Sequence, residues 1–168
     1  MTNKEFFIKQ WNSEVKTTLN CIRTVPDNKS EYKPNPKSRS AKELIAHISL
    51  EANDLITMLE TGAISHDPTI TFNTSEEAAT YYEAKGKSFV EKLQSVDETT
   101  WSTKVIPFTI AGNKIYEAPM SSMAWTYLFD LIHHRGQLST YYRSMGVKNP
   151  SIYGPTAEMM EEMAAKAN

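Results

Sequence analysis

The stretch SSMAWTYLFDLIHHRGQLSTYYRSM, residues 121–145, is the part of the sequence that decides the fold. Its apolar side chains recur at steps of three and four residues, which is the spacing of one face of an α-helix. Gly146 follows directly, and glycine commonly ends helices. The pattern therefore predicts a long helix from Ser121 to Met145. Its apolar positions are Trp125, Leu128, Phe129, Ile132, Leu138 and Tyr142.

Three earlier segments show the same helical spacing. The first covers Lys4–Thr24. The second follows Ser40, which forms a capping-box pattern with Glu43 three residues later, and it ends near Gly62. The third covers Ser75–Val96. Four amphipathic helices in one small chain predict an all-α fold, and the arrangement that buries all four apolar faces is a four-helix bundle.

The segment Val105–Tyr116 differs from the helices. It is rich in β-branched and aromatic residues and is interrupted by Gly112–Asn113, so it predicts a short hairpin before the last long helix. Because Pro107 has no backbone N–H, we expect that the hairpin contains no central strand. The polar, proline-containing segments Pro26–Ser38 and His66–Asn73 are typical of loops.

Composition narrows the functional class. The 168 residues include 18 basic and 20 acidic side chains, a net charge of −2, which argues against a general nucleic-acid binder. The single cysteine, Cys21, excludes an intrachain disulfide. Residues Met1–Gln10 lack the basic start and apolar core of a signal peptide, and no apolar run is long enough to span a membrane. We expect residues 1–168 to form a single cytoplasmic domain.

Two residues of the last long helix, Asp130 and His134, indicate a site for chemistry. Being four residues apart, they share a helix face, where a carboxylate and an imidazole can bind the same metal ion. His133 projects about 100° away from His134. A third ligand has to come from another helix, and His47 on the inward side of the second helix is the candidate. Glu51, four residues after His47, could be a ligand, a hydrogen-bond acceptor for an imidazole or a surface acid.

Each of these residues also has an interpretation without a metal. A lone histidine such as His47 on an apolar helix is often packed in the core, and an acid and a histidine four residues apart often form a simple ion pair. We expect His66 to be a solvated loop residue, and Cys21 to be a packing residue because no partner base is apparent. A short helix is predicted from Thr156. Its methionines are expected to pack against the rest of the molecule: Met159, Met160 and Met163.

Residues 133–148, HHRGQLSTYYRSMGVK, followed by PSIYGP at 150–155, resemble the DinB family of damage-inducible-type proteins. Residues Ser40–Ile48 resemble that family's other motif. The resemblance implies a four-helix bundle, usually a homodimer, in which three side chains hold a divalent metal. These are one histidine of the second helix and a His-x-x-x-His pair on the fourth. By position they are His47, residue 130 and His134, and residue 130 departs from the pattern because it is aspartate.

The resulting set of two histidines and one aspartate suits zinc, nickel, manganese or iron. If Asp130 is not a ligand, Glu51 or His133 is the alternative third ligand. The resemblance also implies that some relatives are transferases or isomerases that use a low-molecular-weight thiol. We therefore expect a metal-dependent hydrolase or thiol-dependent transferase with a small-molecule substrate, and no membrane or nucleic-acid partner. The alternative is a non-catalytic dimeric stress-response or binding module with a vestigial metal site.

Overall fold

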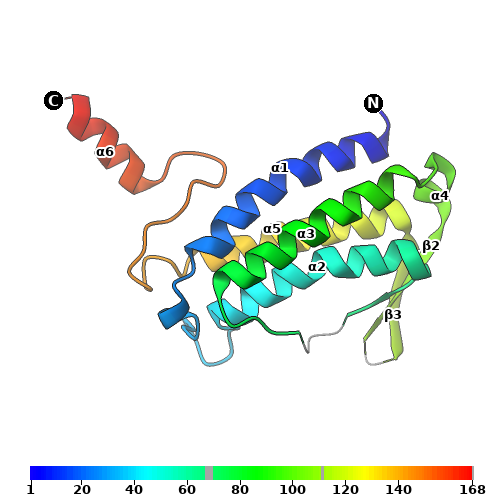
Figure 1. Cartoon of the computed structure of the whole chain (residues 1–168), viewed down its shortest axis with the longest axis horizontal. Helices are drawn as coiled ribbons and strands as arrows, with labels where there is room; N and C mark the ends of the chain where they lie inside the picture. The colour runs from blue at the N-terminus through cyan, green and yellow to red at the C-terminus, as the bar shows by residue number, and fades with distance from the viewer. Residues whose placement is uncertain (67–69, 111, 168) are drawn as a thin grey trace.

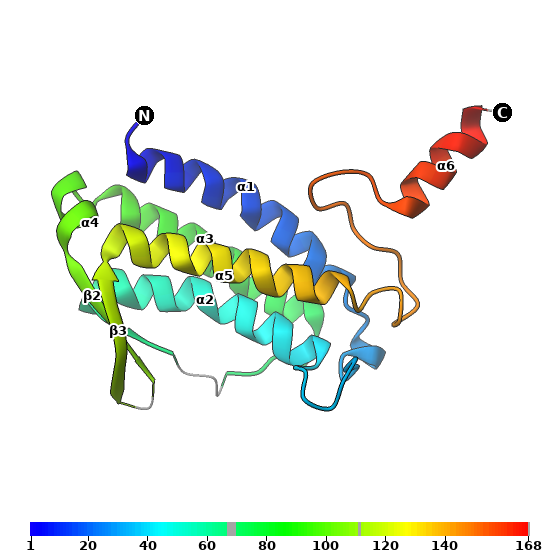
Figure 2. The same ribbon diagram turned by 180° about the vertical axis from the view of Figure 1, so that it is seen from behind.

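Four long helices lying side by side form the body of the molecule in the computed structural model, which describes residues 1–66, 70–110 and 112–167 (Figure 1). Helices α1 and α2 each pack against both α3 and α5. Seen from behind, α5 lies between α1 and α2 (Figure 2). The bounds of the four helices are α1 Asn3–Thr24, α2 Ala41–Thr61, α3 Ser75–Gln94 and α5 Met120–Ser139.

Local signals in the sequence explain where α2 begins and ends. The Ser40 side chain accepts a hydrogen bond from the Glu43 backbone N–H, and the Glu43 carboxylate accepts one from the Ser40 N–H, so the predicted capping box is confirmed. At the other end, Gly62 has a φ of 76°, a left-handed conformation that favours glycine. These two signals fix the ends of α2.

Aromatic side chains fill the core where α1, α3 and α5 meet. Phe7 and Trp11 are fully buried and contact each other and the ring of Phe89. Phe7 also packs edge-on against Trp125 of α5 and against the ring of Trp101. Burial of each such side chain contributes about 1.5–3 kcal/mol, so this cluster holds one end of the helix packing rigidly together.

A small sheet of three strands accompanies the helices, so the prediction of an all-α fold is wrong in the strict sense. Strand β2, Val105–Ile110, pairs antiparallel with β3, Asn113–Pro119, which confirms the predicted hairpin. Strand β1, Ile64–Ser65, pairs in parallel with the other edge of β2. The sheet order β1-β2-β3 makes β2 central, contrary to the expectation from Pro107. Pro107 is tolerated because β1 pairs only with Phe108 and Thr109 beyond it.

The helices differ from the sequence patterns in two respects. Helix α5 ends at Ser139, and turns continue the apolar pattern as far as Gly146, whose φ is 76°. A short helix α4, Glu98–Thr103, capped by Asp97, was not predicted. The predicted loop over 66–73 includes residues 67–69, which lie outside the described residues, and the loop after Pro26 contains the one-turn helix η1, Asp27–Lys29.

The C-terminal helix α6, Ala157–Ala167, stands away from the four long helices (Figure 1). None of its described residues is buried, and its three methionines are 43–61% exposed, so the expectation that they pack is wrong. Ion pairs hold α6 instead, between Arg143 and Glu158 and between Lys148 and Glu162. Charge, not apolar burial, therefore sets the position of this helix.

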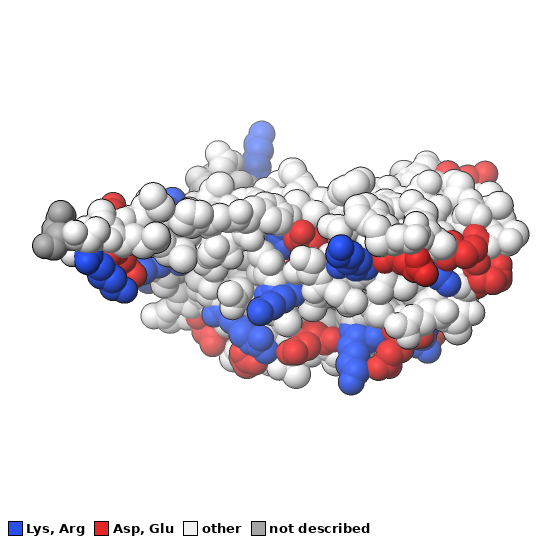
Figure 3. Space-filling view, turned by 90° about the horizontal axis from the view of Figure 1, so that it is seen from above, with Lys and Arg blue, Asp and Glu red and all other residues white. Residues whose placement is uncertain are grey.

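The charged surface is mixed in sign. On the face seen from above, basic and acidic side chains lie interspersed among uncharged residues (Figure 3). Across the described residues, no helix combines the length and the apolar character needed to span a bilayer.

Candidate metal centre

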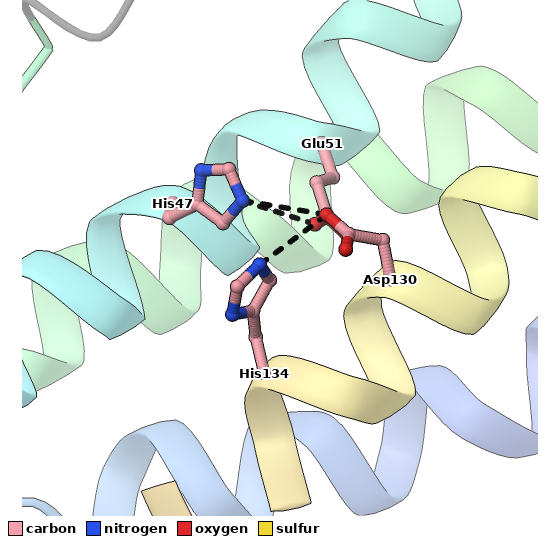
Figure 4. A group of neighbouring side chains, drawn as sticks. All are labelled: His47, Glu51, Asp130 and His134. Carbon is pink, nitrogen blue, oxygen red and sulfur yellow. Dashed lines mark hydrogen bonds and ion pairs between the residues drawn. The ribbon is translucent and has the colours of Figure 1, made fainter. Parts of the chain in front are cut away.

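Four side chains from two helices converge on one point. His47 and Glu51 project from α2, and Asp130 and His134 project from α5 toward them (Figure 4). One donor atom of each lies within 4.8 Å of the donor atoms of the other three. The spacing of four residues on each helix places two donors on one face, and the packing of α2 against α5 brings the two faces together. The structure thus gathers the three predicted ligands and adds Glu51.

The distances among these donors match those around a single ion. Asp130 Oδ2 lies 3.3 Å from His134 Nε2 and 3.4 Å from His47 Nε2, and His47 Nε2 lies 3.6 Å from Glu51 Oε1. Nitrogen and oxygen ligands bind zinc at about 2.0–2.2 Å, which places tetrahedral neighbours about 3.3–3.6 Å from one another. These three donor–donor distances therefore fall within the spacing of tetrahedral ligands, and all four donor atoms lie within 4.8 Å of one another.

Glu51 gives the strongest local indication that a cation belongs here. Its side chain is 2% exposed, and neither carboxylate oxygen has a hydrogen-bond partner among the described residues. Burial raises the pKa of Glu51 well above its usual value, and the nearby carboxylates of Asp130 and Asp54 act in the same direction. A buried carboxylate without a partner is costly, so the donor set fits a positively charged group. The expectation that Glu51 might be a surface acid is excluded.

Asp130, the other acid of the centre, has a pKa that is shifted in the opposite direction from that of Glu51. Its contacts with the imidazoles of His134 and His47 hold the pKa of Asp130 well below its usual range. Burial lowers the pKa of His47, opposed by its contact with Asp130 and reinforced by the nearby guanidinium of Arg39. Asp130 is half-exposed, whereas Glu51 lies at the bottom of the site. The centre therefore has a buried end and an end that faces solvent.

Gln137, one turn after His134 on α5, supports the histidine from behind. Its Oε1 lies 2.9 Å from His134 Nδ1, so the amide accepts the ring N–H and leaves Nε2 directed at the centre. The Gln137 Nε2 is 3.0 Å from His133 Nε2 and donates to it. His133 is absent from the converging group, which agrees with its predicted direction on the helix. Gln137 was missed as a supporting residue, although its position three residues after His134 was a usable signal.

His66 lies beside the centre, so the expectation of a solvated loop residue is wrong. Its Nδ1 is 2.7 Å from Asp54 Oδ2, its side chain is 19% exposed, and its ring lies 5.1 Å from the ring of His47. Tyr127 OH is placed to donate to the same Asp54 oxygen, at 3.4 Å. Asp54 was missed, yet it follows His47 and Glu51 at the next position of the same helix face. His66 could not be placed from the sequence because strand β1 and Asp54 together fix it.

Arg39, like Gln137 and Asp54, is a residue that the sequence analysis did not single out. It precedes the N-cap of α2, and its Nη1 lies 3.4 Å from His134 Nε2. Arg39 and His47 line cavities of about 430 and 310 Å³ that meet at the centre, and Arg39 and His134 line a third cavity of about 850 Å³. The hairpin forms the apolar wall of the second cavity, through Phe108, Ile110 and Tyr116. A small molecule can therefore reach the four donors.

Comparison with known proteins identifies the fold. A Bacillus subtilis (strain 168) protein named "Uncharacterized protein YrdA" is 23% identical over 175 residues, covering 97% of this chain and 95% of that protein. The crystal structure of a DinB-like protein from Bacillus cereus ATCC 10987 matches with a TM-score of 0.72 at 20% identity, covering 89% of this chain and 97% of the other. A second DinB-like structure, YjoA from Bacillus subtilis, has a TM-score of 0.66 at 18% identity, covering 89% and 99%.

The family model described as "DinB family" matches residues 1–166, which extends beyond the motifs that first suggested the resemblance. The match includes both helices that carry the four converging side chains and most of α6. The protein belongs to the DinB family.

Proposed function

We propose that this protein is a metal-dependent enzyme whose four packed helices form a four-helix bundle around a divalent ion. His47, Asp130 and His134 are the ligands in this proposal, and Glu51 provides the fourth donor. The observation that carries the proposal is the buried Glu51 carboxylate, which has no hydrogen-bond partner among the described residues and faces three other donors. Two imidazoles and two carboxylates form a donor set that suits zinc, nickel, manganese or iron.

The proposed reaction is hydrolysis or thiol transfer on a small molecule. A divalent ion in such a site lowers the pKa of a bound water or thiol, which creates a nucleophile at neutral pH. Asp130 is half-exposed, so a reactant can approach from its side. Gln137 fixes the orientation of His134, and the apolar side chains of the hairpin exclude water from one wall of the site.

Metal analysis of protein purified without a histidine tag tests this proposal. We expect about one divalent ion per chain after incubation with zinc or nickel, and loss of the ion in the His134→Ala variant. The Glu158→Ala variant, which removes an acid on the distant helix α6, is the matched control and should retain the ion. Absence of metal from the wild type after incubation would favour the non-catalytic binding module instead.

We also propose a homodimer. Its support is apolar surface on the described residues that this chain leaves exposed, including Phe129 at 61% and Met163 at 61%. Light scattering at micromolar concentration measures the mass directly, and a monomeric mass would refute the dimer without affecting the metal site.

A further inference from the structure

Arg39 differs from the other arginines of the chain in having no acidic partner among the residues that the structure describes. The sequence contains four arginines. Arg23 pairs with Glu76 and Glu83, Arg135 with Glu14, and Arg143 with Glu158. Within the described part of the chain, Arg39 forms no ion pair with a carboxylate. Among the described residues, the Arg39 guanidinium has the His134 imidazole as its side-chain partner, with Arg39 Nη1 3.4 Å from His134 Nε2.

The position of Arg39 places this unpaired cation where a ligand can reach it. Its side chain is exposed and borders each of the three cavities described above. The neighbouring cation Lys42 lines only the first of these cavities and has Glu31 at 3.7 Å. Arg39 is thus a guanidinium that a molecule in any of these cavities can contact.

Occupation of the centre would remove the partner that Arg39 has. The Nη1 of Arg39 and the Oδ2 of Asp130 both approach the same atom, His134 Nε2. That nitrogen has one lone pair, which a metal ligand gives to the ion. Once His134 binds an ion, the Arg39 N–H has no acceptor there and is available to another group.

From this geometry we propose that the centre takes a small organic acid whose carboxylate binds Arg39 while a second polar group of the same molecule binds the ion. This inference rests on the proposed metal site. The guanidinium fork matches a carboxylate in a bidentate arrangement. A singly charged carboxylate suits the site better than a phosphate dianion, because the acids Glu51 and Asp130 already lie there and repel further negative charge.

The size and lining of the adjoining cavity fit such a molecule. The cavity that contains Arg39, His47 and Asp130 has a volume of about 310 Å³ and is closed on one side by Phe108 and Tyr116. Pockets of roughly this size hold small ligands. The carbon chain of the acid would lie against these rings, with its charged end at Arg39.

The test uses cobalt-loaded full-length protein and two thiols of equal length. 3-Mercaptopropionate carries a carboxylate, and 3-mercaptopropionamide is uncharged. Each is titrated while the absorption band of the thiolate bound to cobalt is recorded, and the result is the ratio of the two dissociation constants. We expect the Arg39→Gln variant to lose the preference for the acid by about tenfold relative to wild type, because a charge-assisted pair is lost. Differences in thiol pKa cancel, since the same two thiols are used on both proteins.

Two further variants and one competitor make the result decisive. Lys42→Gln removes a nearby cation and should leave the acid-to-amide ratio unchanged, whereas Arg39→Lys should retain part of the preference because it keeps the charge. An unchanged ratio in Arg39→Gln, or displacement of the acid by millimolar inorganic phosphate, would overturn the inference. Failure of the wild type to bind cobalt would instead overturn the proposed metal site, so the two failures are distinguishable.

Discussion

Two groups of buried charges lie on α5, and they are built in opposite ways. Arg135 is 1% exposed and pairs with Glu14 of α1 at 2.6 Å. Thr18 and Tyr153 supply two further oxygens to its guanidinium, at 3.1 and 2.5 Å. His134 is the preceding residue, and it faces Glu51, a buried carboxylate with no hydrogen-bond partner among the described residues.

The two groups show that one helix, α5, carries a structural ion pair on one face and candidate metal-binding residues on another. Neighbouring residues of a helix project about 100° apart, so His134 and Arg135 face different sides of α5. On the α1 side the charges of Arg135 and Glu14 are paired, and Tyr153 OH also donates to Glu14, which joins the C-terminal segment to the core. On the α2 side the buried Glu51 carboxyl group has no hydrogen-bond partner among the described residues. The paired charges of Arg135 and Glu14 stabilise the fold, whereas the buried Glu51 carboxyl group marks the candidate metal centre.

The largest expected effect comes from breaking the satisfied pair. Glu14→Ala leaves the buried guanidinium of Arg135 without its counter-charge, and we expect the free energy of unfolding to fall by about 3–5 kcal/mol. Urea denaturation followed by circular dichroism measures the change. A Glu14→Leu/Arg135→Met double variant should recover much of the loss, because neither charge remains buried. A loss in Glu14→Ala below about 1 kcal/mol would contradict a structural role for the pair.

The next largest effect concerns metal affinity. Asp130→Ala should weaken binding of zinc or nickel by about tenfold or more, because removal of a ligand has at least the effect of removing a residue that supports one. Asp130→His should retain binding, since both side chains project from the same turn of α5. Calorimetric titration of the three proteins separates the cases. Equal affinity in all three would remove Asp130 from the ligand set and leave Glu51 as the third ligand.

A smaller effect concerns the pH dependence of the metal-free protein. The pKa of Glu51 is raised in the folded state, so the folded chain binds this proton more tightly than the unfolded chain. Its contribution to stability is present below the ordinary glutamate pKa and is lost as the pH rises through the raised value. Glu51→Gln should therefore be more stable than wild type near pH 8 in the presence of a chelator, with the difference shrinking toward about pH 5.

Melting temperatures of Glu51→Gln and wild type across this range provide the measurement. Asp130 and His47 are present in both proteins, so subtracting one melting temperature from the other reduces the contribution of these two residues to the pH dependence. A constant difference at every pH would show that Glu51 is not the titrating group. Addition of zinc should reverse the order of stability, since the protein that keeps all four donors binds the ion more tightly and is stabilised more by it.

The smallest effect belongs to the exposed ion pairs of α6. Lys148→Ala removes a pair with Glu162 in which both side chains are more than half exposed, and we expect no measurable change in the urea midpoint. A clear shift would show that α6 contributes to the stability of the helices, contrary to the exposure of its residues. This variant also sharpens the contrast with Glu14→Ala, because both remove one ion pair.

Local patterns were sufficient to predict the helices and most of the site. The pair Ser40 and Glu43 and the later Gly62 define α2 by interactions within a few residues, so its bounds could be predicted. Asp130 and His134 followed from helical spacing on α5, and His47, with Glu51 four residues later, was the candidate from the second helix before the family resemblance was considered. Each of these features depends on residues within a single helix, so the local sequence is sufficient to predict it.

The features that sequence analysis missed depend on contacts between distant segments. Strand β1 exists because Ile64 pairs with Phe108, and a two-residue strand leaves no periodic pattern. His66 lies beside the centre, where it contacts Asp54, and Arg39 reaches it because the loop before α2 directs it toward α5. The expectation that the α6 methionines pack against the molecule was wrong for a similar reason. An apolar helix face does not determine which other segment, if any, covers it.

The two helices that hold the donors are far apart in the chain, and this separation has a mechanical consequence. The segment between His47 and His134 includes α3, α4 and the hairpin. An ion bound at both ends would close that segment into a loop, as a disulfide does, and a cross-link of this length restricts the unfolded chain by about 4–5 kcal/mol in the entropic model. This chain has a single cysteine and cannot form such a link by oxidation. Its resistance to proteolysis would then follow the supply of metal, not the redox state of its surroundings.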